Sequence, residues 1–120
     1  MQNSPKKFYK KLLGDRGERK ATKYLKKRKY LILEKNLDNV AGEIDIVAQD
    51  SDGVICFIEV KTRENLKYGY PAESVTKERQ RRYRNSATYY LLQKGLTDKV
   101  CRFDVIEVLK GKINHIIDAF

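Results

Sequence analysis

Apolar and small residues recur every three or four positions over residues 6–29, a spacing that predicts a helix. Gly14 and Gly17 each weaken such a helix by about 1 kcal/mol relative to Ala. We therefore expect the helix backbone to approach another element closely on that side. Glu18 lies beside this stripe, which puts a carboxylate at the packed edge of the helix. The stripe consists of Gly14, Gly17, Ala21, Tyr24, Leu25 and Arg28.

Two alternating segments after this helix predict strands over residues 30–35 and 43–49, with a turn at 36–39 between them. Side chains of a strand point alternately to its two faces. On the second strand one face is expected to carry Ile44, Ile46 and Ala48. The other face is expected to carry Glu43, Asp45 and Val47.

Residues 50–53 form a turn signal, so the next strand, 54–62, is expected to return antiparallel as a hairpin. One face of this strand is apolar throughout. The opposite face begins with Ile55 and Phe57 and ends with Glu59 and Lys61. Two charged side chains are therefore predicted at the carboxyl end of a central strand.

The second half of the chain predicts a loop over residues 63–71, a helix over 72–94 and two strands over 102–109 and 112–118. Gly95 is a natural helix end. The order α-β-β-β-α-β-β is typical of an α/β fold with a mixed sheet, in a single domain of 120 residues. The inner face of the second helix is expected to carry Arg79, Tyr83, Ala87, Tyr90 and Leu91, with Gln80 beside them.

Composition excludes several classes of protein. The longest apolar run is five residues, whereas a membrane-spanning helix needs about twenty. With no N-terminal signal pattern, we expect a soluble cytoplasmic protein. Cys56 and Cys101 are expected to be buried free thiols, and with His115 they are too few for a structural zinc site without carboxylates. His115 lies among alternating isoleucines, where a structural role is favoured over a catalytic triad.

The net charge of +10 is unevenly distributed. Residues 1–29 carry +10, residues 30–75 carry −5 and residues 76–94 carry +5. Clustered Lys and Arg attract polyanions, which makes nucleic acid the expected partner. Solvated helix faces are the alternative explanation of such runs. A membrane-surface helix fits poorly because the basic segments lack a broad face of Trp, Phe and Leu.

Asp45, Glu59 and Lys61 are the candidates for chemistry. Glu59 and Lys61 lie on the same strand face, about 7 Å apart, and Asp45 is on the partner strand. Two close carboxylates repel each other, and a divalent cation such as Mg²⁺ or Mn²⁺ relieves that repulsion. Lys61 could position water or offset negative charge. The alternative is a buried ion-pair network with a structural role only.

Several motifs carry a resemblance to a known family: Gly14-x-x-Gly17-Glu18-x-x-Ala21 and the segments 42–48, 57–63, 68–75, 102–106 and 119–120. Together they resemble the bacterial YraN-like family, a functionally uncharacterised group predicted to be endonucleases. That family is similar to the PD-(D/E)xK nucleases and, among them, to archaeal Holliday-junction resolvases. The resemblance implies a restriction-endonuclease-like mixed sheet of about five strands with flanking helices.

The resemblance also implies roles for individual residues. Asp45 and Glu59 would be metal ligands for Mg²⁺ or Mn²⁺, with the Val60 carbonyl a third, and Lys61 would be the catalytic lysine. Glu18 would be an additional acidic residue. Ile44 stands where the superfamily name has Pro, on the strand face expected to lie away from the chemistry. Nucleic-acid contacts are expected from Lys77, Arg79, Gln80, Arg16 and Arg63.

The leading hypothesis is therefore a metal-dependent DNA endonuclease, selective for branched or junction DNA. A non-catalytic nucleic-acid-binding module and an accessory protein on RNA are the alternatives. Resolvase-like relatives work as dimers, which implies a homodimer, although one sequence identifies no self-complementary surface.

Overall fold

A computed structural model describes residues 5–63 and 75–120 of the chain, and the side chains among them from Lys11 onward. The element order confirms the predicted α-β-β-β-α-β-β arrangement and the α/β class. None of the described helices is long and apolar enough to cross a membrane. The elements are α1 (Pro5–Lys27), β1 (Leu31–Asn39), β2 (Gly42–Gln49), β3 (Ile55–Arg63), α2 (Lys77–Lys94), β4 (Cys101–Leu109) and β5 (Lys112–Ile116).

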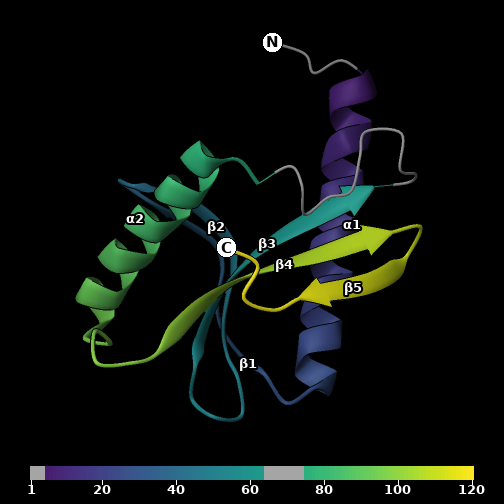
Figure 1. Ribbon diagram of the computed structural model, residues 1–120. Helices are drawn as coiled ribbons and strands as arrows, with labels where there is room; N and C mark the ends of the chain where they lie inside the picture. The colour runs from purple at the N-terminus through teal and green to yellow at the C-terminus, as the bar shows by residue number, and fades with distance from the viewer. Residues whose placement is uncertain (1–4, 64–74) are drawn as a thin grey trace.

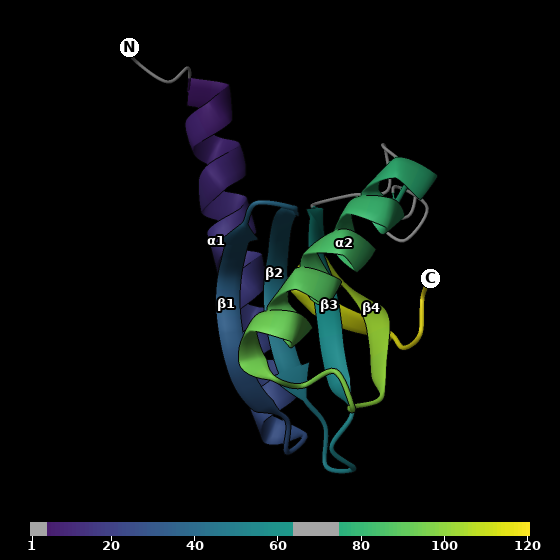
Figure 2. The ribbon, with the colours of Figure 1, turned by 90° about the vertical axis from the view of Figure 1, so that its left-hand side faces the viewer.

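The five strands form one sheet in the order β1-β2-β3-β4-β5. Neighbouring strands are antiparallel except β3 and β4, which are parallel. The β3–β4 connection is therefore a crossover, and it carries α2 (Figure 1). Helices α1 and α2 cover opposite faces of the sheet (Figure 2). The central strand β3 is thus enclosed on both faces, as its nearly continuous apolar sequence predicts.

Each helix covers its own apolar core. The residues of β3 alternate between the two cores, which confirms the predicted faces of this strand. Full burial of a large apolar side chain stabilises the fold by about 1.5–3 kcal/mol. The core under α1 contains Ala21, Leu25, Ile46, Ala48, Cys56, Ile58, Ile106 and Val108. The core under α2 contains Ile44, Val47, Ile55, Phe57, Tyr83, Ala87 and Tyr90.

The predicted turn at residues 36–39 is wrong. Strand β1 continues through them to Asn39, and the chain reverses at Val40 and Ala41 instead. Asn36 has a left-handed backbone (φ 52°), a conformation that Asn tolerates better than most residues. The polar composition of this segment therefore marks a local distortion within the strand and not its end.

Helix α2 begins later than expected. The predicted helical residues 72–74 lie outside the described residues, and Val75 and Thr76 are not helical. Thr76 is extended (φ −69°, ψ 163°), and its side chain accepts a hydrogen bond from the Arg79 N–H, so it caps the helix. Gly95 ends the helix in a left-handed conformation (φ 66°), as predicted.

The two cysteines are free thiols, as expected, but they differ in burial. Cys56 is buried in the core under α1, and burial raises its pKa to about 12. Cys101 is exposed, which contradicts the predicted burial, because it is the first residue of β4 and lies at the end of the sheet.

The close helix approach predicted for α1 occurs at Gly17. A Cβ atom at this position would overlap the Thr62 side chain of β3. Ala21, one turn further along, is fully buried. Gly14 does not share this role, since no described atom would lie within 4 Å of a Cβ there.

These two glycines provide a matched pair for measuring the α1–β3 contact. We expect Gly17→Ala to lower the free energy of unfolding by about 1–3 kcal/mol, because the methyl group overpacks the contact with Thr62. Gly14→Ala should raise it by about 0.5–1 kcal/mol through helix propensity alone. Urea unfolding of both variants gives the comparison. Equal stabilisation by the two substitutions would contradict the close approach.

Candidate active site

Strands β2 and β3 separate at one end of the sheet, and Asp45 lies at that point. Their pairing runs from Gln49 opposite Ile55 to Ile46 opposite Ile58. Just beyond this last pair, Asp45 Oδ2 accepts a hydrogen bond of 2.8 Å from the Val60 N–H. A side-chain carboxylate therefore satisfies a backbone group that strand pairing no longer reaches.

Glu59 is the buried acid of the site, with only 1% of its surface exposed. Its Oε1 atom lies 3.0 Å from Lys61 Nζ and 2.6 Å from Arg79 Nη2. The other oxygen, Oε2, is buried and has no hydrogen-bond partner among the described residues. β3 and α2 thus direct two cations onto one side of a carboxylate and leave its second oxygen without a partner.

Glu18 approaches the same region from α1. With the Asn36 amide oriented so that its nitrogen faces the helix, Asn36 donates to both Glu18 carboxylate oxygens at 3.1 Å. Partial burial raises the pKa of Glu18, and the nearby Asp15 carboxylate adds to this effect. The charge of Glu18 also acts on Asp45. Carboxylates from α1, β2 and β3 therefore lie close enough to influence one another.

Asp45 carries the largest resolved pKa change among these acids. Burial raises its pKa from 3.8 to about 6, and the negative charges of Glu59 and Glu18 add to the rise. The hydrogen bond from Val60 acts in the opposite direction. The protein alone therefore disfavours ionised Asp45 relative to a solvent-exposed Asp, and a nearby cation would lower its pKa.

The donors at this site fit a hard divalent cation. Within the described residues no group of three or more His, Cys, Asp and Glu side chains is placed to hold a metal ion. The oxygen donors that the structure brings to this point are the Asp45 carboxylate and Glu59 Oε2, which has no partner among the described residues. A small set of oxygen ligands suits Mg²⁺ or Mn²⁺, which keep several waters.

Arg79 is the one expected nucleic-acid contact that touches the acidic residues. The Gln80 amide instead donates to the Val75 carbonyl at 3.1 Å, at the start of α2. Lys77 and Arg16 are exposed, and Arg63 donates to the Thr62 carbonyl at 3.4 Å. Within the described chain, none of these four forms an ion pair with Asp45 or Glu59.

The expected position of Ile44, on the face away from the chemistry, is wrong. Ile44 packs under α2, on the face that carries Glu59 and Lys61. It pairs with Leu37, which packs against the same core, whereas Ile46 two residues later faces α1. The left-handed Asn36 (φ 52°) lies in β1 at this change of face, so strict alternation fails there.

Two features of the site were not predicted: the approach of Tyr83, expected on the inner face of α2, to the acids, and the contacts of Ser86. Tyr83 lies near the acids, and burial, reinforced by the charges of Asp45 and Glu59, raises its pKa. The hydroxyl of buried Ser86 lies 3.1 Å from Asn39 Oδ1 and 3.3 Å from the Gly42 carbonyl and can donate to either acceptor, while the Asn39 amide donates to the Ser86 carbonyl at 3.1 Å. Because Tyr83 follows Arg79 by four residues, the helix spacing puts the two side chains on the same face of α2. No sequence pattern indicates the Ser86 contacts. These contacts fix α2 over the β1–β2 turn.

An open pocket of about 510 Å³ lies between α2 and the β1–β2 turn. Arg79 contributes to its wall, so the pocket is next to the acidic cluster. Its lining is polar and of both charges: Asp38, Asn39, Val40, Ala41, Gly42, Glu43, Arg79, Arg82 and Tyr83.

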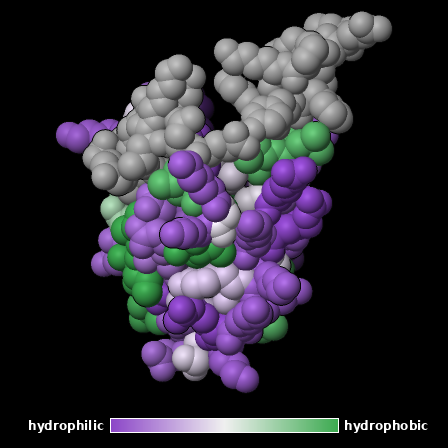
Figure 3. Space-filling model, turned by 90° about the vertical axis from the view of Figure 1, so that its right-hand side faces the viewer, coloured by the Kyte–Doolittle hydropathy of each residue, from purple (hydrophilic) through white to green (hydrophobic). Residues whose placement is uncertain are grey.

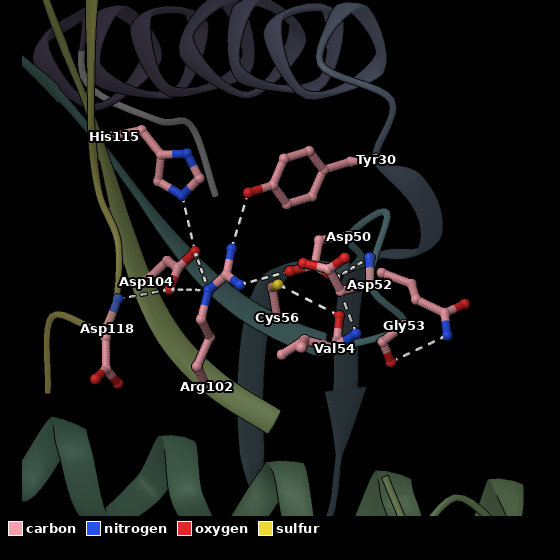
Figure 4. A network of polar contacts seen from close by, with 11 residues as sticks. Tyr30, Asp50, Asp52, Gly53, Val54, Cys56, Arg102, Asp104, His115 and Asp118 are labelled. Atoms are coloured by element: carbon pink, nitrogen blue, oxygen red, sulfur yellow. Dashed lines mark hydrogen bonds and ion pairs between the residues drawn. The ribbon is translucent and has the colours of Figure 1, made fainter. Parts of the chain in front are cut away.

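A second polar network, centred on Arg102 and Asp104, has a structural role (Figure 4). Arg102 donates to Asp50 at 2.7 Å, to Tyr30 at 2.8 Å and to Asp104 at 3.1 Å. His115 Nε2 lies 2.8 Å from Asp104. The network joins the β2–β3 turn to β4 and β5. These contacts agree with the structural role expected for His115.

Comparisons with known proteins identify relatives along most of the chain. The model of a family described as "Uncharacterised protein family UPF0102" matches residues 17–108. This stretch contains Glu18, Asp45, Glu59, Lys61 and Arg79, and UPF0102 is the YraN family suggested by the sequence motifs.

Three relatives show the extent of the similarity. A UPF0102 protein of Clostridioides difficile (strain 630) is 47% identical over 109 residues, which cover 89% of this chain and 95% of the relative. One from Clostridium perfringens is 48% identical over 120 residues, covering 95% and 98%. Another, from Caldicellulosiruptor saccharolyticus, is 41% identical over 106 residues, covering 88% and 89%.

The raised pKa of Asp45 predicts a pH-dependent stability. Between pH 3.8 and about 6 the folded chain binds more protons than the unfolded chain, so stability falls as pH rises through this window. Asp45→Asn can still accept the Val60 hydrogen bond but does not ionise. In EDTA at pH 7 we expect this variant to be more stable than the wild type by up to about 3 kcal/mol.

Urea unfolding of the metal-free protein between pH 4 and 7.5 measures this difference. Near pH 4 the advantage of Asp45→Asn should largely vanish. Asp98→Asn, in an exposed turn, is the control and should follow the wild type. Parallel stability curves for wild type and Asp45→Asn would contradict the raised pKa.

Proposed function

The chain belongs to the UPF0102 family, and from its site geometry we propose that it is a Mg²⁺- or Mn²⁺-dependent DNA endonuclease that hydrolyses phosphodiester bonds, with selectivity for branched or junction DNA. One observation carries the proposal. Glu59 is buried beside Asp45, with two cations on one oxygen and no described partner on the other. A buried polar atom without a partner requires an explanation, and a divalent cation supplies one.

Asp45, Glu59 and the Val60 carbonyl would hold the metal ion. When bound, such an ion activates a water molecule and stabilises negative charge on the phosphorus. Asp45 is kept in place by the Val60 N–H at 2.8 Å, so its carboxylate is oriented before any ligand arrives. Lys61 and Arg79 likewise orient Glu59, through ion pairs of 3.0 Å and 2.6 Å.

Lys61 supplies a positive charge at the site. Its side chain is 17% exposed and stays 3.0 Å from Glu59. A cation held in this position can orient a water by hydrogen bonding or offset negative charge that develops during hydrolysis.

Arg79 is suited to contact a phosphate. Its side chain is 47% exposed although it touches buried Glu59, and it lies in the first turn of α2. Helix N-termini favour anions, and the Arg guanidinium matches phosphate geometry. The pocket beside it offers space for part of a nucleic-acid strand.

A non-catalytic nucleic-acid-binding module is the second candidate. The observation in its favour is that Lys61 and Arg79 already compensate the charge of Glu59. In that case the Glu59 cluster is a structural ion-pair network, and binding needs no metal.

Metal binding and cleavage, measured together, test the proposal. We expect wild-type protein to bind Mn²⁺ in calorimetry and to cut branched DNA in Mg²⁺ or Mn²⁺. Asp45→Ala and Glu59→Gln should lose Mn²⁺ binding, because each removes a negatively charged carboxylate from the site. Lys61→Met should keep Mn²⁺ binding but lose cleavage by about 100-fold or more. Asp98→Asn removes an exposed carboxylate elsewhere and should match the wild type.

Equal cutting by wild type and all site variants would show contamination and overturn the proposal. Absence of Mn²⁺ binding, together with metal-independent DNA binding that falls steeply with salt, would favour the non-catalytic module.

A further inference from the structure

A cationic surface begins beside the acidic cluster, in a groove of about 430 Å³ between α1 and β1. We call it the α1 groove. Lysine and arginine side chains from successive turns of α1 form one wall, and Lys35 of β1 extends it across to the sheet. The lining residues are Arg19, Thr22, Lys23, Lys26, Lys27 and Lys35.

The α1 groove carries five positive charges and no acidic side chain in its lining. Its basic residues are exposed, and none forms an ion pair with another described residue. Thr22 is occupied, since its hydroxyl donates to the Glu18 carbonyl at 2.8 Å. Like charges gathered in this way repel one another, so a polyanion in the groove would relieve the repulsion.

The dimensions of the groove match a nucleic-acid backbone. From Arg19 to Lys27 the helix advances about 12 Å. A DNA strand advances 3.4 Å per nucleotide along the duplex axis, so this length corresponds to three or four phosphates. The lining offers no aromatic or large aliphatic side chain for insertion into a lipid surface, which favours nucleic acid over an anionic membrane.

The groove begins next to the candidate active site. Arg19 follows Glu18 in α1, and Lys35 precedes Asn36 in β1. The Asn36–Glu18 hydrogen bonds of 3.1 Å join the two elements at this end. From there the lining residues follow α1 to Lys27, and Figure 2 shows α1 beside β1. Hydrophilic side chains also follow α1 on the face that carries β5, at the right of Figure 3.

We propose that the α1 groove binds the phosphate backbone of one DNA arm whose scissile strand is held at the Asp45–Glu59 site. This inference rests on the proposed function. Arg79 lies on the α2 face of the sheet, and the groove lies on the α1 face. Because Arg79 and the α1 groove lie on opposite faces beside a common site, a branched molecule can contact both with separate arms, whereas a straight duplex cannot follow both faces.

The test compares two double variants of equal charge change. Lys23→Gln/Lys26→Gln removes two groove cations, and Lys94→Gln/Lys99→Gln removes two exposed cations at the far end of α2. The probes are a labelled four-way DNA junction and a linear duplex of the same length, in EDTA so that no cleavage occurs. Affinity is measured between 50 and 200 mM salt, after circular dichroism has shown that both variants are folded.

We expect the groove variant to bind the junction about tenfold more weakly at 0.1 M salt, with a log–log salt slope reduced by about two. Linear duplex should lose less affinity, and the Lys94/Lys99 variant should match the wild type on both probes. Equal slopes for the two double variants would overturn the inference. The inference would also be overturned if the groove variant lost binding to anionic-lipid vesicles while its binding to DNA was unchanged.

Failure of the proposed function is distinguishable from failure of this inference. If the groove variant weakens junction binding but no protein cuts DNA in Mn²⁺, the α1 groove stands and the endonuclease proposal fails. If cleavage depends on Asp45 and Glu59 but the groove variant binds as the wild type does, the endonuclease proposal stands and the groove inference fails.

Discussion

Where β2 and β3 part beyond Ile46 and Ile58, the Val60 N–H needs an acceptor that the neighbouring strand no longer supplies. Asp45 Oδ2 takes that place at 2.8 Å. This hydrogen bond gives the Val60 donor a partner where strand pairing has ended, and it fixes a carboxylate beside Glu59. The candidate site depends on it, because separation of the strands gives the acids access to a ligand.

The electrostatics of the site fit a ligand-binding role better than a purely structural one. Buried ion pairs add little net stability, since desolvation offsets the attraction between the charges. Here Glu59 has two cations on one oxygen, while its second oxygen and the neighbouring Asp45 remain poorly compensated. Buried carboxylates that lack full charge compensation lower the stability of the fold, and such groups are common at functional sites.

Sequence patterns predict most of the fold because β3 is apolar on both faces in its first half and both helices carry one buried stripe. Turn residues predict the β2–β3 hairpin, and Gly95 predicts the end of α2. Strand alternation predicts the common face of Glu59 and Lys61. The face of Ile44 is not predicted, because alternation assumes a regular strand and Asn36 adopts a left-handed backbone. The contacts of Ser86 with Asn39 also escape prediction, since they join residues 47 apart in the chain.

The distortion at Asn36 connects the two parts of the molecule that carry charge. By leaving the regular strand conformation, Asn36 can direct its amide to Glu18 on α1, while the facing strand presents Asp45 toward β3. The acidic cluster and the α1 groove therefore meet at one position of the sheet, although they lie mainly on opposite faces. A change in the position of α1 would alter Glu18, and through its charge the ionisation of Asp45. The tight approach of Gly17 to Thr62 limits such movement, so the residue that precedes Glu18 in α1 helps to keep this carboxylate in place.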